Sequence, residues 1–182
     1  MIMDAFSELG LERRLGISAN AVREAYREKI RSAHPDAGGS AEQAQRLATA
    51  MAILESPGRR ARHWLELQGM EVQGGIGSMD NDLADMFEPV ATAIEKTRTA
   101  TAEVSATHSA LGKAMAARKM LAARDQLESL LDTMAEMLAQ AETQLAGMDQ
   151  TGRAHAVAKM AHRLMFLEKW RAEMREALAR MV

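Results

Sequence analysis

Histidines and carboxylates are the residues of this sequence that could perform chemistry, and their spacing forms no catalytic or metal-binding set. The chain has 182 residues, five of them histidine and none cysteine, which excludes disulfides, thiol nucleophiles and thiolate metal sites within it. His155 and His162 are seven residues apart on one expected helix face, with no third ligand beside them. The carboxylates are interleaved with Lys and Arg, as on a solvated helix face. We expect no catalytic residue, no metal site and no cofactor.

A binding site is indicated instead by His34, Pro35 and Asp36, which follow a helix-forming segment directly. Proline stiffens the backbone and disfavours helix in the residue before it. The carboxylate of Asp36 would therefore be presented at little entropic cost, in a form suited to bidentate pairing with an arginine of another molecule. We expect His34 to brace the loop by a hydrogen bond. An ordinary turn is the alternative.

A basic stripe precedes this loop. Three arginines spaced four residues apart share one face of the expected helix, and a lysine lies nearby. Taken alone, such a stripe could be a solvated face balanced by Glu24 and Glu28. Beside the His-Pro-Asp loop it becomes a candidate docking surface. Its members are Arg23, Arg27, Lys29 and Arg31.

Composition predicts that helices position these residues. Only 3% of residues are aromatic and 3 are proline, whereas 15 are methionine, so helix formers dominate and strand formers are sparse. Four glycines between residues 69 and 78 mark a linker. We expect an all-α protein with an N-terminal domain over 1–69, a Gly-rich linker over 70–80 and a helical bundle over 81–182.

Apolar spacing and turn residues predict the helices of the first domain. A short helix should stop at Gly10, and a longer one should begin after Ser18 or Asn20 and end before the proline. The sequence Ser40–Gln43 fits a capping box that opens a third helix. A last short helix follows and buries Trp64, Leu65 or Leu67. The long second helix should bury one stripe, formed by Val22, Ala25, Tyr26, Ile30 and Ala33.

Three longer apolar stripes predict an antiparallel three-helix bundle in the second domain. Pro89 should either kink the first of these helices or mark a start near Glu88, and we favour the kink. We expect the second helix to end at Gly147 and the third to be capped by Thr151. The stripes are Leu83, Phe87, Val90 and Ile94; Leu127, Leu131, Met134, Leu138, Ala141 and Leu145; and Val157, Met160, Leu164, Leu167, Met174, Leu178 and Met181.

Taken together, the His-Pro-Asp loop, the basic helix before it and the Ala/Leu-rich helix after it resemble a J domain. The resemblance implies that the basic stripe docks on an acidic face of a DnaK-type (heat-shock-70) chaperone. It also implies that Asp36 engages an arginine of that partner and biases it towards ATP hydrolysis. J domains usually carry a Lys after the Asp, and here it is Ala37, so docking should depend more on the arginines.

An N-terminal J domain followed by a short linker and about 100 residues of helical bundle is similar to the HscB family of iron–sulfur co-chaperones. The segment Arg163–Arg171 resembles the signature of that family's last helix, and Asp82–Glu88 resembles its first bundle helix. The resemblance implies a patch that binds an IscU-like scaffold protein. Position by position, this client patch falls on Leu83, Phe87, Glu88, Glu95 and Phe166.

Periodicity gives an independent view of that patch. Phe166 lies about 100° from Leu167 and about 200° from Leu164, so Phe166 and Trp170 sit off the core stripe. They form either an exposed aromatic pair suited to binding or part of a wide core. Phe87 continues a core stripe and is expected to be buried.

The sequence thus predicts a co-chaperone that is not an enzyme, with a DnaK/HscA-type chaperone and an IscU-like scaffold as partners. A net charge of −2 offers no bulk attraction to nucleic acid or anionic lipid. The absence of an apolar span or secretory signal favours the cytoplasm. We expect a monomer or weak dimer. The alternatives are a J protein with another client and a purely structural helical protein.

Overall fold

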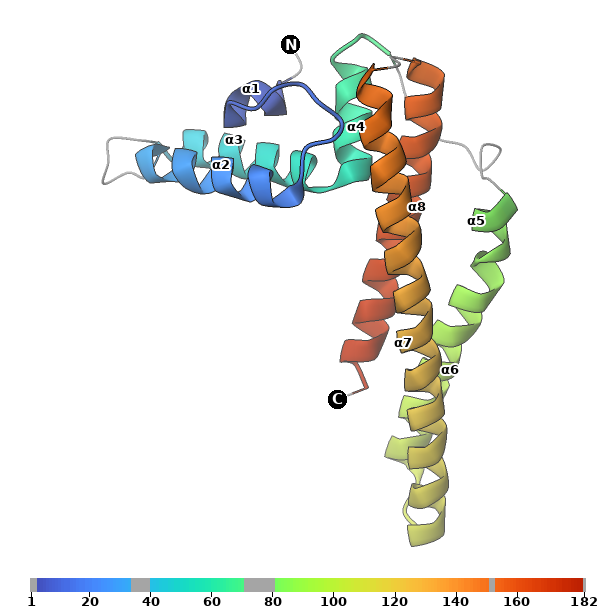
Figure 1. Cartoon of the computed structure of the whole chain (residues 1–182). Helices are drawn as coiled ribbons and strands as arrows, with labels where there is room; N and C mark the ends of the chain where they lie inside the picture. The colour runs from blue at the N-terminus through green and yellow to red at the C-terminus, as the bar shows by residue number, and fades with distance from the viewer. Residues whose placement is uncertain (1–2, 34–39, 71–80, 151–152, 182) are drawn as a thin grey trace. The chain divides into compact units, whose positions relative to one another are not determined.

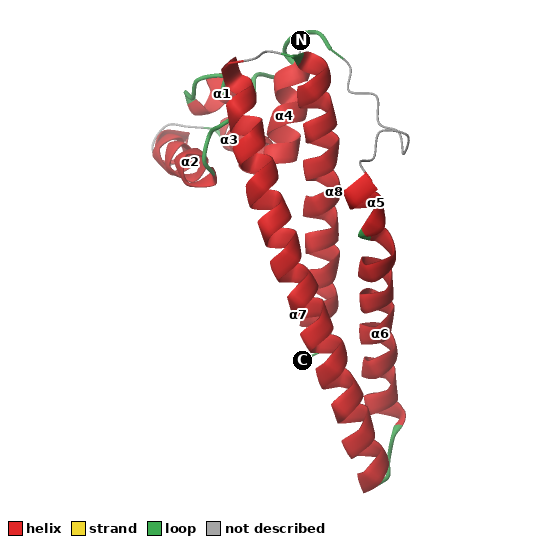
Figure 2. Ribbon diagram, turned by 45° about the vertical axis from the view of Figure 1, so that its right-hand side comes forward, coloured by secondary structure: helices red, strands yellow, loops and turns green. Residues whose placement is uncertain are grey.

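The protein is described by a computed structural model over residues 3–33, 40–70, 81–150 and 153–181. Within these ranges it is made of helices and loops, without strands, as Figure 1 and Figure 2 show. The all-α fold class is therefore confirmed. No helix in the described parts of the chain is long and apolar enough to cross a membrane. In order, the helices are α1 (Ala5–Leu9), α2 (Ala19–Ala33), α3 (Ala41–Glu55), α4 (Pro57–Glu66), α5 (Asn81–Asp85), α6 (Phe87–Ala106), α7 (Ala110–Gly147), the 3-10 helix η3 (Met148–Gln150) and α8 (Ala154–Ala179).

The helices form two compact units. The first unit combines the range Met1–Ser78 with Gln140–Met165, and the second combines Met79–Ala139 with Phe166–Val182. The long helices α7 and α8 thus each contribute one part to either unit. The expected linker over 70–80 lies almost wholly outside the described residues, and the predicted domain boundaries stay a prediction.

The first unit is built on the α2–α3 hairpin, in which the two helices lie side by side with α1 against them (Figure 1). Val22 and Ala33 of α2 are buried in its core, and Ala25, Tyr26 and Ile30 are partly buried against it. The predicted stripe of α2 therefore faces the core, which leaves the opposite side of this helix to solvent. The remaining buried members of the core are Ala5, Phe6, Leu9, Leu47, Ala50 and Leu54.

The helix ends of this unit follow the predicted capping residues. Gly10 ends α1 in the left-handed conformation at φ 69°, which glycine adopts without steric cost. The Ser18 hydroxyl accepts from the N–H of Ala21 at 3.2 Å, so Ser18 rather than Asn20 caps α2. The Ser40 hydroxyl accepts from the N–H of Gln43 at 3.1 Å and opens α3.

Asp4 caps α1 and is an ionised anchor of the first unit. Its Oδ1 accepts from the N–H of Phe6 at 3.1 Å, and its Oδ2 accepts from the Ser7 hydroxyl at 2.6 Å and from Arg13 at 2.8 Å. Burial raises the pKa of this carboxyl, but the hydrogen bonds from Ser7 and Arg13 outweigh burial and hold the pKa below its ordinary value.

Two buried polar side chains of α4 tie the first unit together. His63 Nε2 accepts from the N–H of Ala5 at 3.0 Å, which joins α4 to the start of α1. Arg60 is 3% exposed; its Nε donates to the Leu15 carbonyl at 2.9 Å and its Nη1 to the Leu54 carbonyl at 2.6 Å. The buried charge is thereby placed against backbone acceptors, as burial requires.

Asp149 of η3 holds the loop before α2 by accepting hydrogen bonds from its backbone. Its Oδ1 accepts from the N–H of Leu15 at 2.5 Å, and its Oδ2 accepts from the N–H of Gly16 at 3.0 Å. A Cβ at Gly16 would lie 2.9 Å from the Cβ of Ala146, so the loop approaches α7 at a distance that only glycine allows. The amino-terminal helices and the α7–α8 turn are therefore joined within one compact unit.

The second unit begins with an interrupted helix instead of the kinked helix favoured from the sequence. α5 ends at Asp85, Met86 is not helical, and α6 begins at Phe87. Pro89 thus lies in the first turn of α6, where backbone N–H groups have no partner within the helix and a missing donor costs little. The alternative start near Glu88 is the one that the structure adopts.

α6 and the first half of α7 form an antiparallel hairpin joined by the short loop at 107–109, as Figure 2 shows. Lys119 of α7 pairs with Glu103 of α6 at 2.7 Å, and Lys96 donates to Gln126 at 3.1 Å. α7 begins at Ala110, well before the apolar stripe that indicated it, because the segment between is rich in strong helix formers.

The predicted stripes supply the buried faces of the three long helices. Leu131 is the exception in the second stripe, since it is only half-buried. Thr97 is the one buried polar residue of α6, and its hydroxyl donates to the carbonyl of Ala93 at 2.8 Å. Thr151, expected to cap α8, lies outside the described residues. Buried stripe members are Leu83, Val90, Leu127, Met134, Leu138, Ala141, Leu145, Val157, Met160, Leu164, Leu167 and Met174.

Candidate functional site

The exposed side of α2 carries two of the arginines predicted for docking. Arg27 and Arg31 lie one helical turn apart, opposite the buried stripe, and both are exposed. Neither guanidinium forms an ion pair with another of the described residues. Their charge is therefore available to an acidic partner surface.

The other two members of the basic stripe are placed differently. Arg23 Nε donates to Glu55 of α3 at 2.6 Å, and its Nη1 donates to Asn20 at 3.0 Å, so its charge is already paired within the first unit. Lys29 lies beside Gly10, with its Cε and Nζ both 3.3 Å from where a Cβ on that glycine would be. Of the four predicted residues, Arg23 alone has its charge paired with another described side chain, whereas Arg27, Lys29 and Arg31 are exposed. Their part in docking stays a prediction.

His34, Pro35 and Asp36 lie outside the described residues. The described structure defines the two helix ends on either side of them. α2 ends at Ala33, and α3 begins after the cap Ser40. The His-Pro-Asp sequence therefore starts immediately after the helix that presents Arg27 and Arg31.

Three aromatic side chains gather in the second unit, at the start of α6 and in the middle of α8. The Phe87 ring lies edge-on to the Trp170 ring with centroids 6.1 Å apart, and the Phe166 ring lies 6.0 Å from the same indole. Such separations and tilts are the favourable ones for aromatic pairs. We call Phe87, Phe166 and Trp170 the aromatic patch.

Exposure differs sharply among the members of the aromatic patch. Trp170 is 5% exposed and therefore belongs to a wide core, which excludes its interpretation as an exposed binding residue. Phe166 is half-buried. Phe87, expected in the core, is 60% exposed. The buried indole thus supports two phenyl rings, and the more exposed of them lies at the start of a helix.

The other residues predicted for the client patch fall into two groups. Leu83 is 2% exposed, so it presents no surface to a client. Glu88 is exposed and follows Phe87 directly. Glu95 is exposed and accepts from Arg98 at 2.6 Å and 2.9 Å; that hydrogen bond lowers the pKa of Glu95. Glu88 and Phe87 together are the accessible part of the first segment.

Histidines do not gather into a metal site in the described structure. His155 is exposed and His162 half-buried on α8. Within the described residues, no group of three or more His, Asp or Glu side chains is placed to hold a metal ion.

No protein-family model matches the sequence, and no curated protein matches it. Solved structures do match. The chaperone HscB from Vibrio cholerae superposes with a TM-score of 0.63 at 22% identity, covering 99% of this chain and 100% of that one. The chain has the HscB fold. The human co-chaperone protein HscB superposes with a TM-score of 0.59 at 15% identity, covering 96% of this chain and 81% of that one.

The HscB fold confirms the resemblance predicted from the sequence over nearly the whole chain. It agrees with a helical hairpin flanked by α1 and α4, followed by three long helical segments. At identities of 22% and 15%, these superpositions establish the fold alone. The functional argument therefore depends on the residues that this chain presents.

One group of exposed apolar residues on α7 was not predicted from the sequence. Leu111, Met115 and Leu121, in the first turns of α7, are among the most exposed large hydrophobic residues of the described structure, together with Phe87. A signal was present, because the segment 110–124 contains four cations and no acidic residue. A surface both apolar and of one charge sign is unusual for a solvated helix face.

Proposed function

We propose that this protein is a J-type co-chaperone that recruits a DnaK/HscA-type heat-shock-70 chaperone, stimulates its ATPase and delivers an IscU-like iron–sulfur scaffold protein. The fold supports this proposal, since the solved structures that share it bear the names chaperone HscB and co-chaperone protein HscB. The chain itself catalyses nothing. Nucleotide and metal cluster belong to its partners.

The observation that carries the proposal is the placement of Arg27 and Arg31 directly before the His-Pro-Asp sequence. Both guanidiniums are exposed on α2, opposite its buried stripe, and neither is paired with another described residue. α2 ends at Ala33, so Asp36 follows the end of this helix by three residues. A cationic surface steers an acidic partner and accelerates encounter. A carboxylate beside it supplies one directional contact to a partner arginine.

The aromatic patch is the proposed client surface. Phe87 is 60% exposed, and burying its apolar ring against a partner would contribute favourable free energy to binding. The ring of Phe166 rests on Trp170 beside it, and a buried tryptophan holds both rings with little loss of side-chain entropy on binding. Glu88 adds a charge at the rim of this surface. Aromatic anchors with a polar rim are typical of binding hot spots.

The mechanism couples two binding events. Arg27 and Arg31 hold the chaperone while the aromatic patch holds the client, so the client is kept at high effective concentration near the chaperone's peptide site. Contact with Asp36 then biases the chaperone towards hydrolysis, and the two binding steps favour each other.

Steady-state ATP turnover by a purified DnaK-type chaperone from the same organism tests the first half. Wild-type protein should stimulate turnover, and Asp36→Asn should abolish the stimulation. Arg27→Glu should require about tenfold more co-chaperone for half-maximal stimulation, because it reverses one steering charge. Arg59→Glu is the matched control, since Arg59 is an exposed arginine of α4. If wild type does not stimulate, or if Asp36→Asn stimulates equally, the J-domain function is wrong.

Calorimetric titration with an IscU-type scaffold tests the second half. Phe87→Ser and Phe166→Ala should each weaken scaffold binding at least about tenfold, the range of hot-spot truncations. Leu111→Ser is the matched control, because Leu111 is 73% exposed and lies on α7. If wild type stimulates the chaperone but does not bind the scaffold, the protein serves a different client. If both variants bind as wild type does, the scaffold binds outside the aromatic patch and the proposed client surface is wrong.

A further inference from the structure

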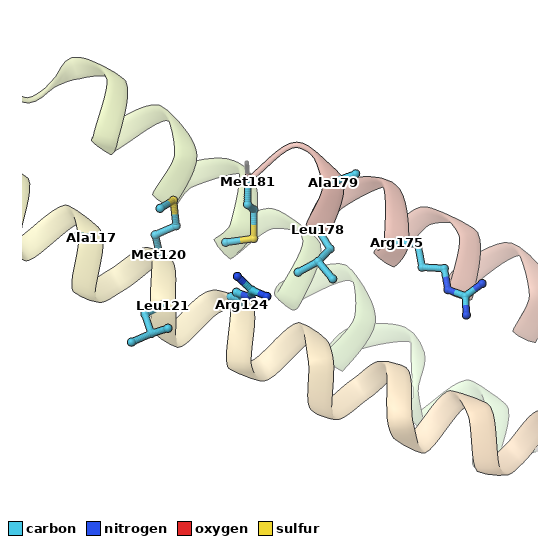
Figure 3. A pocket seen from close by; sticks show the side chains of 8 residues that line it. All are labelled: Ala117, Met120, Leu121, Arg124, Arg175, Leu178, Ala179 and Met181. Atoms are coloured by element: carbon cyan, nitrogen blue, oxygen red, sulfur yellow. The ribbon is translucent and has the colours of Figure 1, made fainter.

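The end of α8 and the first half of α7 form an apolar groove in the second unit that the proposed co-chaperone function does not use. The groove encloses about 590 Å³. We call it the α7–α8 groove. Its principal side chains are Met120, Leu121 and Arg124 from α7, Arg175 and Leu178 from the end of α8, and Met181 directly after α8 (Figure 3).

The apolar lining of this groove continues a core stripe beyond the point where the core ends. Leu164, Leu167 and Met174 of α8 are buried, whereas Leu178 and Met181 follow at the same spacing and are only half-buried. Figure 3 shows both side chains directed from α8 towards α7. A core stripe that runs on without a cover is a surface on which another apolar side chain gains free energy by binding.

The charged side chains that line the groove are arginines. Among the described residues that line it, Arg124 and Arg175 are charged and none is acidic. Arg124 Nε donates to Glu128 at 2.8 Å, whereas Arg175 is exposed and has no ion pair within the described structure. Lys113 lies one turn before Ala117 on the same strip of α7 and adds a third cation. The groove is thus apolar along its floor and cationic at its rim.

We propose that the α7–α8 groove binds an amphipathic helical segment of a partner protein, with acidic residues flanking its apolar face. Apolar side chains one turn apart on such a helix would fit between Leu121, Leu178 and the two methionines, and its carboxylates would pair with Arg175 and Lys113. Methionine side chains repack readily around different apolar partners, which suits a groove of this kind.

The shape of the groove favours a helical segment over a lipid surface. Its lining comes from two helices with a hollow between them, whereas a bilayer is met by the outward face of one helix. Leu121 is 59% exposed at the edge of the hollow, where it would contact an inserted helix from the side. The groove and the aromatic patch share no residue, so the two surfaces can be tested separately.

Methyl resonances of the labelled full-length protein test this inference directly. The probe is a synthetic peptide of about 15 residues, long enough to form a helix on binding, with leucines at helical spacing flanked by glutamates. With ¹³C-methyl methionine, the peptide should shift the signals of Met120 and Met181. The signals of Met134 and Met174, both buried in the core, should stay in place.

Fluorescence anisotropy of the labelled peptide compares the affinity of wild type with that of variants at exposed positions. Arg175→Glu and Leu121→Ser should each weaken the peptide about fivefold or more. Arg153→Glu carries the same charge change at an exposed position before α8 and should bind as wild type does. A version of the peptide with lysine in place of glutamate should not bind. Retained stimulation of the chaperone by all three variants would show that the co-chaperone function is intact.

Three results would overturn the inference. The first is the absence of binding by the acidic peptide, or equal binding by wild type and both groove variants. The second is binding to vesicles of phosphatidylserine and phosphatidylcholine in place of the peptide, with loss in Leu121→Ser, which would assign the groove to lipid. The third is a concentration-dependent dimer, detected by sedimentation, that Leu121→Ser dissociates, which would assign it to a second copy.

Discussion

Replacing Asp149 by alanine should destabilise the first unit, because this carboxylate is the acceptor for two consecutive backbone donors. The N–H groups of Leu15 and Gly16 donate to it at 2.5 Å and 3.0 Å, and Leu15 is fully buried. A hydrogen bond to a charged group contributes about 1.5–3 kcal/mol, and a buried N–H left without a partner costs about 1–3 kcal/mol. Allowing for water reaching the more exposed Gly16, we expect the free energy of unfolding to fall by about 3 kcal/mol.

The two tryptophans of the chain make the stability of the first unit measurable by fluorescence. Trp64 packs on the core of the first unit, and Trp170 is buried in the second. In a Trp170→Phe background, fluorescence during urea unfolding therefore reports on the first unit. With a urea dependence of about 1.5–2 kcal/mol per molar, a loss of about 3 kcal/mol moves the midpoint down by about 1.5–2 M.

Asp132→Ala is the control for this experiment, because Asp132 is an exposed aspartate of α7 in the second unit. Its free energy of unfolding in the same background should stay within about 0.5 kcal/mol of the wild-type value. Asp149→Asn, which keeps one carbonyl acceptor, should fall between wild type and Asp149→Ala. An unchanged midpoint in Asp149→Ala would refute the role assigned to this carboxylate.

Three further predictions follow from the described contacts. Because the pKa of Asp4 is lowered in the folded protein, wild type should be more stable than Asp4→Asn above about pH 4, the ordinary pKa of aspartate, and the difference should vanish as urea titrations are taken to lower pH. Gly16→Ala should lower Tm, since its Cβ would lie 2.9 Å from another Cβ, whereas Gly147→Ala meets nothing within 4 Å and should be neutral or stabilising. Trp170→Ala should lower the free energy of unfolding by about 3–5 kcal/mol, because the indole is buried. Phe87→Ala should change it by no more than about 0.5 kcal/mol, because that ring is exposed. Chemical denaturation measures both, and equal losses would contradict the difference in burial.

Local sequence signals were sufficient for most helix ends of the first unit. Ser18, Ser40 and Gly10 act within one or two turns of themselves, through a hydroxyl accepting a nearby N–H or a glycine adopting positive φ. The buried stripe of α2 was also predictable, because the face that a stripe occupies depends on spacing along one helix. Arg27 and Arg31 could be placed on the exposed face for the same reason.

Contacts between residues that are far apart in the sequence could not be predicted from local patterns. Asp149 is separated by more than 130 residues from the N–H groups it accepts, and nothing in its neighbourhood distinguishes it from a helix-end aspartate. His63 and Arg60 likewise find their partners across the fold. Pro89 was compatible with a kink and with a helix start, and the helix interruption at Met86 decided between them.

Sequence alone determined that this protein is helical, where its main apolar stripes lie, and that a His-Pro-Asp motif follows a basic helix, because these depend on backbone propensity and on spacing within one element. Only the tertiary structure decided which side chains of the aromatic patch are buried. Trp170 is covered and Phe87 exposed, since burial is set by the neighbouring helices that pack over a residue and not by its place in a pattern.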